Sequence, residues 1–258
     1  MTSGPDGGGD AAVGNGSTTG SPDPPGTAHG GRLDVVVLAG GTGRRLGGAS
    51  KPDVVARGAR LLDHVLAGLK ELSGRGGPAE PPGAAGPRTG RVVVVAPEGV
   101  ALPVGVLRAL EDPPLGGPVA GIAAGLARLA RAPGPTASAP APAALTAVVT
   151  CDAPESWRAL PALIAAASHG ADGACAREGD HVQYLLGVYR TAALTRCAAP
   201  EGTALRDVSV RRALGGLEVA RVDLGGLRAA ARDLDTWEDV RAWDRAGGAA
   251  GGTAPAAR

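Results

Sequence analysis

The sequence of 258 residues lacks the features that mark membrane proteins, secreted proteins and disulfide-rich domains. No apolar run approaches the length that a bilayer requires, and the N-terminus has no charged-then-apolar signal pattern. Only three cysteines are present (Cys151, Cys175 and Cys197), and none has the C-x-x-C spacing of a zinc site or a redox motif. We therefore expect a cytoplasmic protein with reduced thiols and no membrane partner.

The sequence also lacks an excess of one charge, because it has 26 Lys and Arg residues and 25 Asp and Glu residues. A nucleic-acid-binding role therefore has no global electrostatic support. Glycine, alanine and proline are abundant, and they concentrate in segments that are poor in branched apolar residues. On this basis we expect disordered tails at 1–31 and 247–258 and one folded domain at 32–246. Low-complexity surface insertions are expected near 73–90 and 132–144.

The most informative stretch is a glycine-rich segment that follows the apolar run 35–38. The run reads as a buried strand, and five of the ten residues 39–48 are glycine. No acidic residue occurs between positions 35 and 52, although the same stretch carries Arg44, Arg45 and Lys51. A strand that ends in a flexible cationic loop is suited to hold an anion, and nucleotide phosphates are the most plausible choice.

Two common phosphate-binding motifs do not fit this loop. A dinucleotide fingerprint counted from Gly41 and Gly43 would need a third glycine where Leu46 stands. A Walker A loop would need Gly-Lys-Ser/Thr, whereas Lys51 follows a serine and precedes a proline. A dinucleotide-dependent oxidoreductase is therefore the least favoured class of enzyme.

The order of expected elements indicates an α/β protein with a mostly parallel central sheet and helices on both faces. Strands are predicted at 34–38, 91–96, 145–151, 182–190 and 218–223. Helices are predicted at 60–72, from 118 onward, at 156–168, 203–214 and 236–245. Because ligands bind beyond the carboxyl ends of such strands, the glycine loop and Asp152 are expected to share one crevice.

Asp152 directly follows the strand predicted at 145–151, and two interpretations of it are open. A carboxylate held rigidly at a strand end suits Mg²⁺, which takes one or two carboxylates together with phosphate oxygens and water. Aspartate is also common as the N-cap of a following helix. The glycine loop upstream favours the metal interpretation.

The glycine loop resembles the first loop of the molybdenum cofactor guanylyltransferases and their MobA-like NTP transferase relatives, L-A-G-G-x-x-x-R-M/L-G-G-x-x-K. The matching residues are Leu38, Ala39, Gly40, Gly41, Arg45, Leu46, Gly47, Gly48 and Lys51. One departure is Ser50, since the family usually has aspartate before the lysine. The resemblance implies a three-layer α/β/α, Rossmann-like nucleotidyltransferase fold of the GT-A type.

Further segments are similar to the same family. Cys151-Asp152-Ala-Pro resembles its C-D-x-P motif, whose aspartate binds the metal. Asp112 precedes a Gly-Pro-Val-Ala-Gly turn at the place of an aspartate that contacts the nucleotide, although Glu111 could take this role. Residues 180–190 resemble a segment beside the second substrate. Residues 233–239 resemble a terminal N-T-P-E-D motif, with aspartate for asparagine and tryptophan for proline, and they are also a good helix start.

The resemblance implies transfer of GMP from Mg²⁺-GTP to the phosphate of molybdopterin or Mo-molybdopterin, with release of pyrophosphate. It also implies transient contact with other proteins of molybdenum cofactor biosynthesis. The implied catalytic residues are Arg45, Lys51 and Asp152, with Asp152 holding Mg²⁺. The implied nucleotide-binding residues are Leu38, Ala39, Gly40, Gly41, Lys51, Asp112 and Asp152.

Three other functions stay open at this point. Within the same class, the chain could be a molybdopterin cytidylyltransferase or act on another phosphate acceptor. It could also be a catalytically silent nucleotide-binding module.

Overall fold

The computed structural model describes residue 1 and residues 32–41, 43–74, 88–131 and 141–250. Its main sheet has seven strands: β1 (Arg32–Leu38), β4 (Arg88–Val95), β5 (Leu107–Ala109), β6 (Leu145–Thr150), β7 (Gly173–Glu178), β8 (His181–Arg190) and β9 (Val219–Asp223). The helices are α1 (Leu61–Gly74), α2 (Gly117–Arg131), α3 (Leu160–Ala167), α4 (Thr191–Ala198), α5 (Val210–Leu214) and α6 (Trp237–Ala250). A short hairpin, β2 (Val55–Ala56) and β3 (Ala59–Arg60), precedes α1.

The sheet is mostly parallel, with the strand order β5-β4-β1-β6-β8-β7-β9. Strand β1 lies at its centre and pairs in parallel with β4 and β6, so that Val36 is opposite both Val93 and Val148. Both faces of β1 are covered, which explains why it reads as an unbroken apolar run rather than as an alternating pattern. Strand β8 is antiparallel to β6 and β7. The predicted fold class is therefore confirmed.

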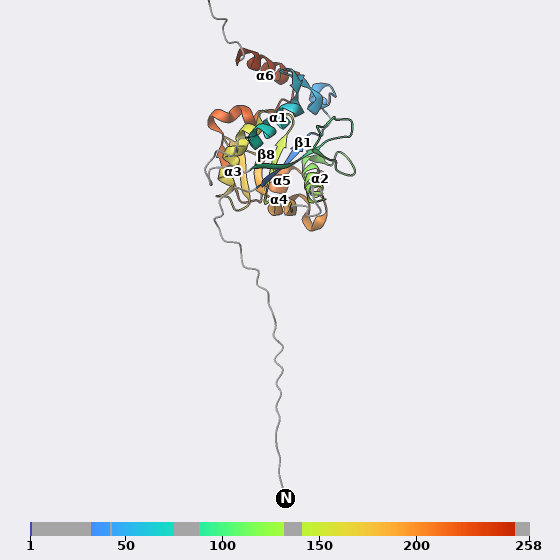
Figure 1. Ribbon diagram of the computed structural model, residues 1–258, viewed down its shortest axis with the longest axis vertical. Helices are drawn as coiled ribbons and strands as arrows, with labels where there is room; N and C mark the ends of the chain where they lie inside the picture. The colour runs from blue at the N-terminus through green and yellow to red at the C-terminus, as the bar shows by residue number, and fades with distance from the viewer. Residues whose placement is uncertain (2–31, 42, 75–87, 132–140, 251–258) are drawn as a thin grey trace, which may run out of the picture.

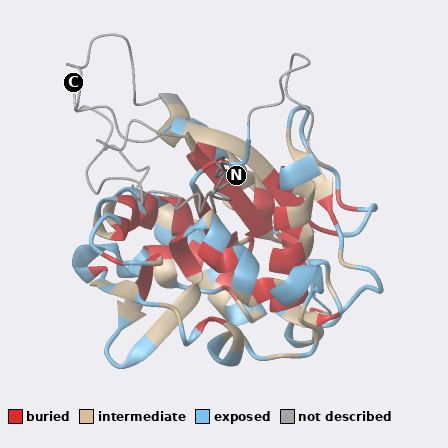
Figure 2. Cartoon of the chain, turned by 90° about the horizontal axis from the view of Figure 1, so that it is seen from below, coloured by how far each residue is buried: buried red, intermediate tan, exposed pale blue. Residues whose placement is uncertain are grey.

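Helices cover both faces of the sheet and form three layers (Figure 1). Helices α1 and α3 pack on one face, and α2, α4 and α5 pack on the other. Alternate side chains of β1 divide between the two cores, because Val35 and Val37 join the α1–α3 side while Val36 faces the side of α2. In Figure 2 the buried residues are concentrated in the central strands and in the inner sides of these helices.

Helix α6 lies away from the two main cores, beside the β2–β3 hairpin (Figure 1). Its Val240 and Trp243 pack in a small separate core with Leu46 and Leu61. The Arg57 guanidinium lies 3.7 Å from the centre of the Trp243 ring. Arg57 Nη2 and Nε also donate to the Trp243 carbonyl oxygen at 2.6 and 2.9 Å.

Several elements differ from those expected. Strands β5 and β7 and helix α4 were not predicted, because their sequences are short or rich in alanine and carry little periodicity. The helix expected at 203–214 is limited to α5, since Asp207 adopts a left-handed φ of 54° that no α-helix accommodates. The helix expected at 156–168 begins as a 3₁₀ turn, η3 (Ser156–Ala159), before α3.

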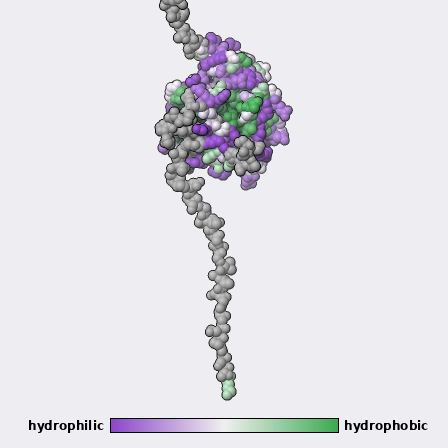
Figure 3. Space-filling model, in the orientation of Figure 1, coloured by the Kyte–Doolittle hydropathy of each residue, from purple (hydrophilic) through white to green (hydrophobic). Residues whose placement is uncertain are grey.

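The ends of the domain can be compared with the expected boundaries only in part. Helix α6 continues to Ala250, four residues beyond the expected domain end at 246. Residues 2–31, 75–87, 132–140 and 251–258, which include most of the expected tails and insertions, lie outside the described residues. Among the helices that the structure describes, none is long and apolar enough to cross a membrane. Hydrophilic residues cover much of the described surface in Figure 3, with an apolar area near the middle of that face.

Candidate functional site

The site forms where β1 and β6 end side by side. The Cys151 amide, directly after β6, donates to the Leu38 carbonyl oxygen at 2.9 Å, so the two strand ends are held together. The glycine loop leaves β1 at this point, and Asp152 follows β6. The Asp152 carbonyl oxygen accepts from the Leu234 amide at 2.8 Å, which brings the segment before α6 to the same place. Three parts of the chain that are distant in sequence therefore meet at the carboxyl ends of β1 and β6.

The glycine loop is closed by a tight turn at Gly43. Its carbonyl oxygen accepts from the amides of Leu46 (2.8 Å) and Gly48 (3.0 Å). Gly43 has a left-handed φ of 55°, and an added Cβ would collide with the Ala49 carbonyl oxygen. A glycine is therefore required here, and the turn brings the loop back to the short 3₁₀ helix η2 (Lys51–Asp53), which carries Lys51.

Lys51 lies between two carboxylates. Its Nζ donates to Asp152 Oδ2 at 2.7 Å and to Asp235 Oδ1 at 2.6 Å. Arg45 Nη1 donates to the other oxygen of Asp235 at 3.0 Å. Burial alone would lower the pKa of Lys51, but its hydrogen bonds and ion pairs to both aspartates raise it above its usual value. Lys51 is therefore a permanent cation at the centre of the site.

A third carboxylate, Asp233, lies near this pair. Burial by the surrounding protein atoms is the largest cause that raises the pKa of Asp233, and repulsion from Asp152 and Asp235 adds to it. Together they raise this pKa to about 6. Asp233 is exposed on the side of the β8 cavity, which limits the effect of burial and leaves repulsion between the carboxylates as a major cause. Close carboxylates with a single lysine between them form a site that attracts further positive charge.

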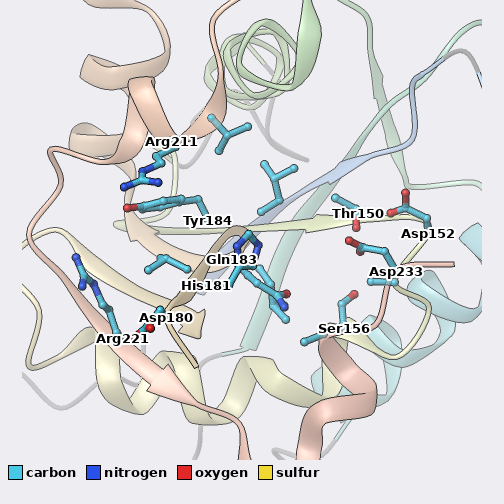
Figure 4. Close-up of a pocket in the computed structure, with 16 residues that line it drawn as sticks. Thr150, Asp152, Ser156, Asp180, His181, Gln183, Tyr184, Arg211, Arg221 and Asp233 are labelled. Atoms are coloured by element: carbon cyan, nitrogen blue, oxygen red, sulfur yellow. The ribbon is translucent and has the colours of Figure 1, made fainter. Parts of the chain in front are cut away.

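Two cavities meet at Asp152. The first, which we call the glycine-loop cavity, has a volume of about 370 Å³ and is lined by Leu38, Gly40, Gly41, Glu111 and other residues near the N-terminus of α2. The second, the β8 cavity, has a volume of about 510 Å³ and lies over β8 and beside α5 and β9 (Figure 4). Both are lined by Thr150, Asp152 and Leu185. Groups bound in the two cavities would therefore meet at Asp152.

The structure places the predicted site residues as follows. Leu38, Gly40, Gly41 and Asp152 line the glycine-loop cavity, and Lys51 and Arg45 are joined to it through Asp152 and Asp235. Ala39 does not line it, because this buried residue points into the core while its amide donates to the Val95 carbonyl oxygen at 3.0 Å.

Asp112 does not line the glycine-loop cavity, whereas its neighbour Glu111 does. Asp112 lies instead in a second hollow beside α2, which Glu111 also lines. Glu111 Oε1 is held in place because it accepts from the Leu115 amide at 3.0 Å.

Asp233 and Asp235 are the residues that the sequence analysis did not assign to the site. The capping interpretation of this segment is confirmed for Thr236, whose Oγ1 exchanges hydrogen bonds with Asp239 at the start of α6. Asp235, the residue before this cap, turns to Lys51. The only available signal was the similarity of residues 233–239 to the terminal motif of the family.

The donor set fits a hard divalent cation. Asp152 and Asp235 already hold one positive charge, the Lys51 ammonium, between their oxygens, and Asp152 lines both cavities. Mg²⁺ needs no more than one or two carboxylates when phosphate oxygens supply other ligands. Within the described ranges, no three Asp, Glu, His or Cys side chains are already arranged as a complete metal site. A cation here would therefore depend on the phosphates of a bound nucleotide.

The sequence profile of the MobA-like NTP transferase domain matches residues 35–219, most of the chain. One curated relative is the molybdenum cofactor guanylyltransferase of Acidiphilium cryptum (strain JF-5), which is 45% identical over 56 residues. That match covers 19% of this chain and 29% of the relative, so it spans less than a third of that protein.

Solved structures show the same fold at low sequence identity. The molybdopterin-guanine dinucleotide biosynthesis protein A of Archaeoglobus fulgidus superposes with a TM-score of 0.57 at 20% identity, covering 84% of this chain and 99% of that one. The protein Rv0371c of Mycobacterium tuberculosis gives a TM-score of 0.53 at 17% identity, covering 83% of this chain and 98% of that one. These similarities support the α/β architecture described above.

Proposed function

Because the chain belongs to the MobA-like NTP transferase family of nucleotidyltransferases, we propose that it transfers GMP from GTP to the phosphate of molybdopterin. The observation that carries the proposal is the meeting of two cavities at Asp152, with Lys51 bound to its carboxylate. A donor nucleotide in one cavity and a phosphate acceptor in the other would bring their reacting phosphates together at this point. Nothing in the reaction requires a membrane, and we place it in the cytoplasm.

The nucleotide is assigned to the glycine-loop cavity. Backbone amides of the loop and the positive charge of Lys51 would hold its phosphates. Glu111 lines this cavity, and its carboxylate would accept from N1–H and the 2-amino group of guanine. Cytosine does not offer this pair of donors, so Glu111 favours GTP over CTP. We therefore assign the base contact to Glu111 in place of Asp112.

The reaction joins two anions. An oxygen of the acceptor phosphate attacks the α-phosphorus of GTP, the bond to the β-phosphate breaks, and pyrophosphate leaves with the electron pair. The acceptor is already ionised, so no strong general base is needed and the difficulty is electrostatic. Lys51 would move from the carboxylates to the phosphate oxygens, and Arg45 would follow on the outer side. Asp152 and Asp235 would hold Mg²⁺, which supplies charge neutralisation across the phosphates.

A binding experiment tests the nucleotide. The full chain is melted with Mg²⁺ and each of GTP, CTP, ATP and UTP at roughly a hundred times the dissociation constant, where a specific ligand adds about 2.7 kcal/mol of stability. We expect a shift with GTP that Glu111→Gln reduces. A shift with CTP alone would identify a cytidylyltransferase. The absence of a shift with any nucleotide would refute nucleotide binding in the glycine-loop cavity.

A turnover experiment tests the reaction. With Mg²⁺-GTP and molybdopterin, we expect pyrophosphate release and a product with the mass of the guanine dinucleotide. Lys51→Ala and Asp152→Asn should each lower kcat by about 10²- to 10³-fold, as the loss of one preorganised electrostatic group does. Lys70, the other lysine of the chain, is exposed on α1 and provides the matched control Lys70→Ala. Normal turnover by Asp152→Asn at saturating Mg²⁺ would exclude the proposed metal role.

Nucleotide binding without Mg²⁺-dependent pyrophosphate release, with any acceptor tested, would indicate a silent binding module instead.

A further inference from the structure

The β8 cavity has opposite charges at its two ends (Figure 4). Asp152 and Asp233 lie on one side, next to the point where the two cavities meet. Arg211 and Arg221 lie on the other side, where Asp180 is the one acidic residue among the labelled side chains. A phosphate held at Asp152 would lie at the opposite end of the cavity from both arginines.

The fold brings the two arginines to the cavity from different elements. Arg211 is on α5, which is anchored by the fully buried Leu214. Arg221 is on β9, where its neighbours Ala220 and Val222 pack into the α1–α3 core. Because side chains alternate along a strand, Arg221 points to the opposite face, the one that α5 covers.

The strand between the two ends is shaped to form the floor of the cavity. In the β7–β8 pairing, Cys175 is opposite Gly187 while the next residue of β7 is opposite Gln183, so β8 carries three additional residues, 184–186. All three line the cavity. A bulge of this kind re-aims side chains and is typical of the margin of a binding site. The Tyr189 hydroxyl fixes it by donating to the Tyr184 carbonyl oxygen at 2.6 Å.

Neither arginine side chain is bound to another residue in the part of the chain that the structure describes. Among the residues that the structure describes, no side chain or carbonyl oxygen accepts a hydrogen bond from the Arg211 or Arg221 guanidinium, and neither takes part in an ion pair. Asp180 lies beside Arg221 in Figure 4, but the two do not form an ion pair. By contrast, Arg57 and Arg60 each bind a carboxylate. Both residues are exposed, and two unpaired guanidinium groups that line one concave site can bind an anion from solvent.

We propose that the acceptor carries a second anionic group, apart from its reacting phosphate, and that Arg211 and Arg221 bind it. This inference rests on the proposed function, because it places the reacting phosphate at the Asp152 end. The substrate class is thus a phosphomonoester with a further anion at its far end. The volume of about 510 Å³ is sufficient for a small molecule of this type.

The test uses probes that do not depend on the identity of the acceptor. Alkanediol bisphosphates of increasing chain length, each compared with the monophosphate of the same alkanediol, are titrated into the full chain saturated with Mg²⁺ and a GTP analogue whose bond between the α- and β-phosphates cannot be cleaved. We expect at least one bisphosphate to bind about tenfold or more tightly than its monophosphate, as one added charge-assisted contact allows. Arg211→Gln and Arg221→Gln should each reduce this preference several-fold while leaving the monophosphate affinity unchanged.

Arg212→Gln is the matched control, because Arg212 is the next residue of α5 and is exposed like Arg211, but does not line the cavity. It should keep the full preference for the bisphosphate. Equal affinity for bisphosphate and monophosphate at every chain length would overturn the inference. So would a preference that survives both arginine substitutions, or a loss of monophosphate binding in parallel, which would assign the arginines to the reacting phosphate.

The outcome is separable from that of the proposed function. If the protein transfers GMP but does not prefer the bisphosphates, only the inference about the arginines is wrong. If the preference depends on both arginines but the protein releases no pyrophosphate from GTP, only the proposed reaction is wrong.

Discussion

At the scale of single residues, Asp34 is a fully buried charge with a structural task. Its carboxylate accepts from the Arg91 guanidinium at 2.8 Å and from the amides of Arg91 (2.9 Å) and Ala143 (3.0 Å). Burial would raise the pKa of Asp34, but these hydrogen bonds outweigh it and hold the pKa below the usual value of 3.8. Asp34 thereby ties β1 to β4 and to the segment before β6.

Asp34→Asn is expected to lower the free energy of unfolding by about 3 kcal/mol at neutral pH, because it removes one partner of a buried ion pair. A carboxyl group with a lowered folded pKa stabilises the protein above its unfolded pKa, and this contribution disappears as the pH falls through the folded value. The difference between wild type and variant should therefore shrink below about pH 3.8. Urea unfolding of both proteins at a series of pH values measures this difference in the free energy of unfolding.

Glu98→Gln is the control, since Glu98 is exposed and should leave the unfolding free energy nearly unchanged at every pH. A pH-independent difference for Asp34→Asn would show that packing, and not the carboxylate charge, causes the loss.

At the scale of elements, the glycine loop depends on the turn at Gly43. Gly43→Ala would place a Cβ against the Ala49 carbonyl oxygen and distort the loop, so we expect nucleotide affinity to fall by about tenfold or more. Gly47 also has a left-handed φ, 67°, but an added Cβ there meets open space. Gly47→Ala should cost only about 1 kcal/mol of stability and little affinity. Titration of GTP into both variants separates the effect of a left-handed φ, which both positions share, from that of the collision at Gly43. Equal affinities of the two variants for GTP would show that the collision does not matter for binding.

Helix α6 is a second element whose position affects the site. Trp243 Nε1 donates to Glu155 Oε1 at 2.8 Å, and Arg57 donates to the same oxygen at 3.0 Å. Glu155 lies three residues after Asp152, and Asp235 lies two residues before α6. The contacts of α6 therefore hold both carboxylates that bind Lys51.

Trp243→Ala should lower the free energy of unfolding by about 3 kcal/mol, as the loss of a large buried aromatic side chain does, and should also weaken nucleotide binding. Arg241→Ala, an exposed change on the same helix, should change stability by less than about 0.5 kcal/mol. Chemical unfolding and GTP titration of both variants test this. Unchanged nucleotide affinity in a destabilised Trp243→Ala protein would show that α6 stabilises the fold without positioning the site.

At the scale of the whole molecule, two separate cavities open onto one carboxylate. In the proposed reaction both substrates are bound together, so that direct transfer needs no covalent enzyme intermediate. We expect initial rates with varied GTP and acceptor to give intersecting double-reciprocal lines, and no label from the α-phosphate of GTP to remain on the protein. Parallel lines, together with a labelled protein after denaturation, would require a ping-pong reaction.

Much of the fold follows directly from sequence patterns. The apolar runs of β1, β4 and β6 and the helical spacing in α1 and α2 are local signals that survive folding because these segments are buried as the patterns require. Strand β7 carries no such signal, since its alanine-rich sequence becomes a strand only through pairing with β8 and β9. The pairing partners are distant in sequence, and their contribution is invisible in a local window.

The sequence by itself determined the glycine loop with its cations and the carboxylate at the end of β6, because glycine conformations and strand ends are local properties. Only the tertiary structure decided which carboxylates face Lys51. Asp235 is 184 positions away from it along the chain, and Glu111 rather than Asp112 lines the cavity. The two unpaired arginines of the β8 cavity are likewise a property of the folded chain. They reach this cavity from α5, which packs on β8, and from β9, which pairs with β7 at the end of the sheet, and no local pattern records this placement.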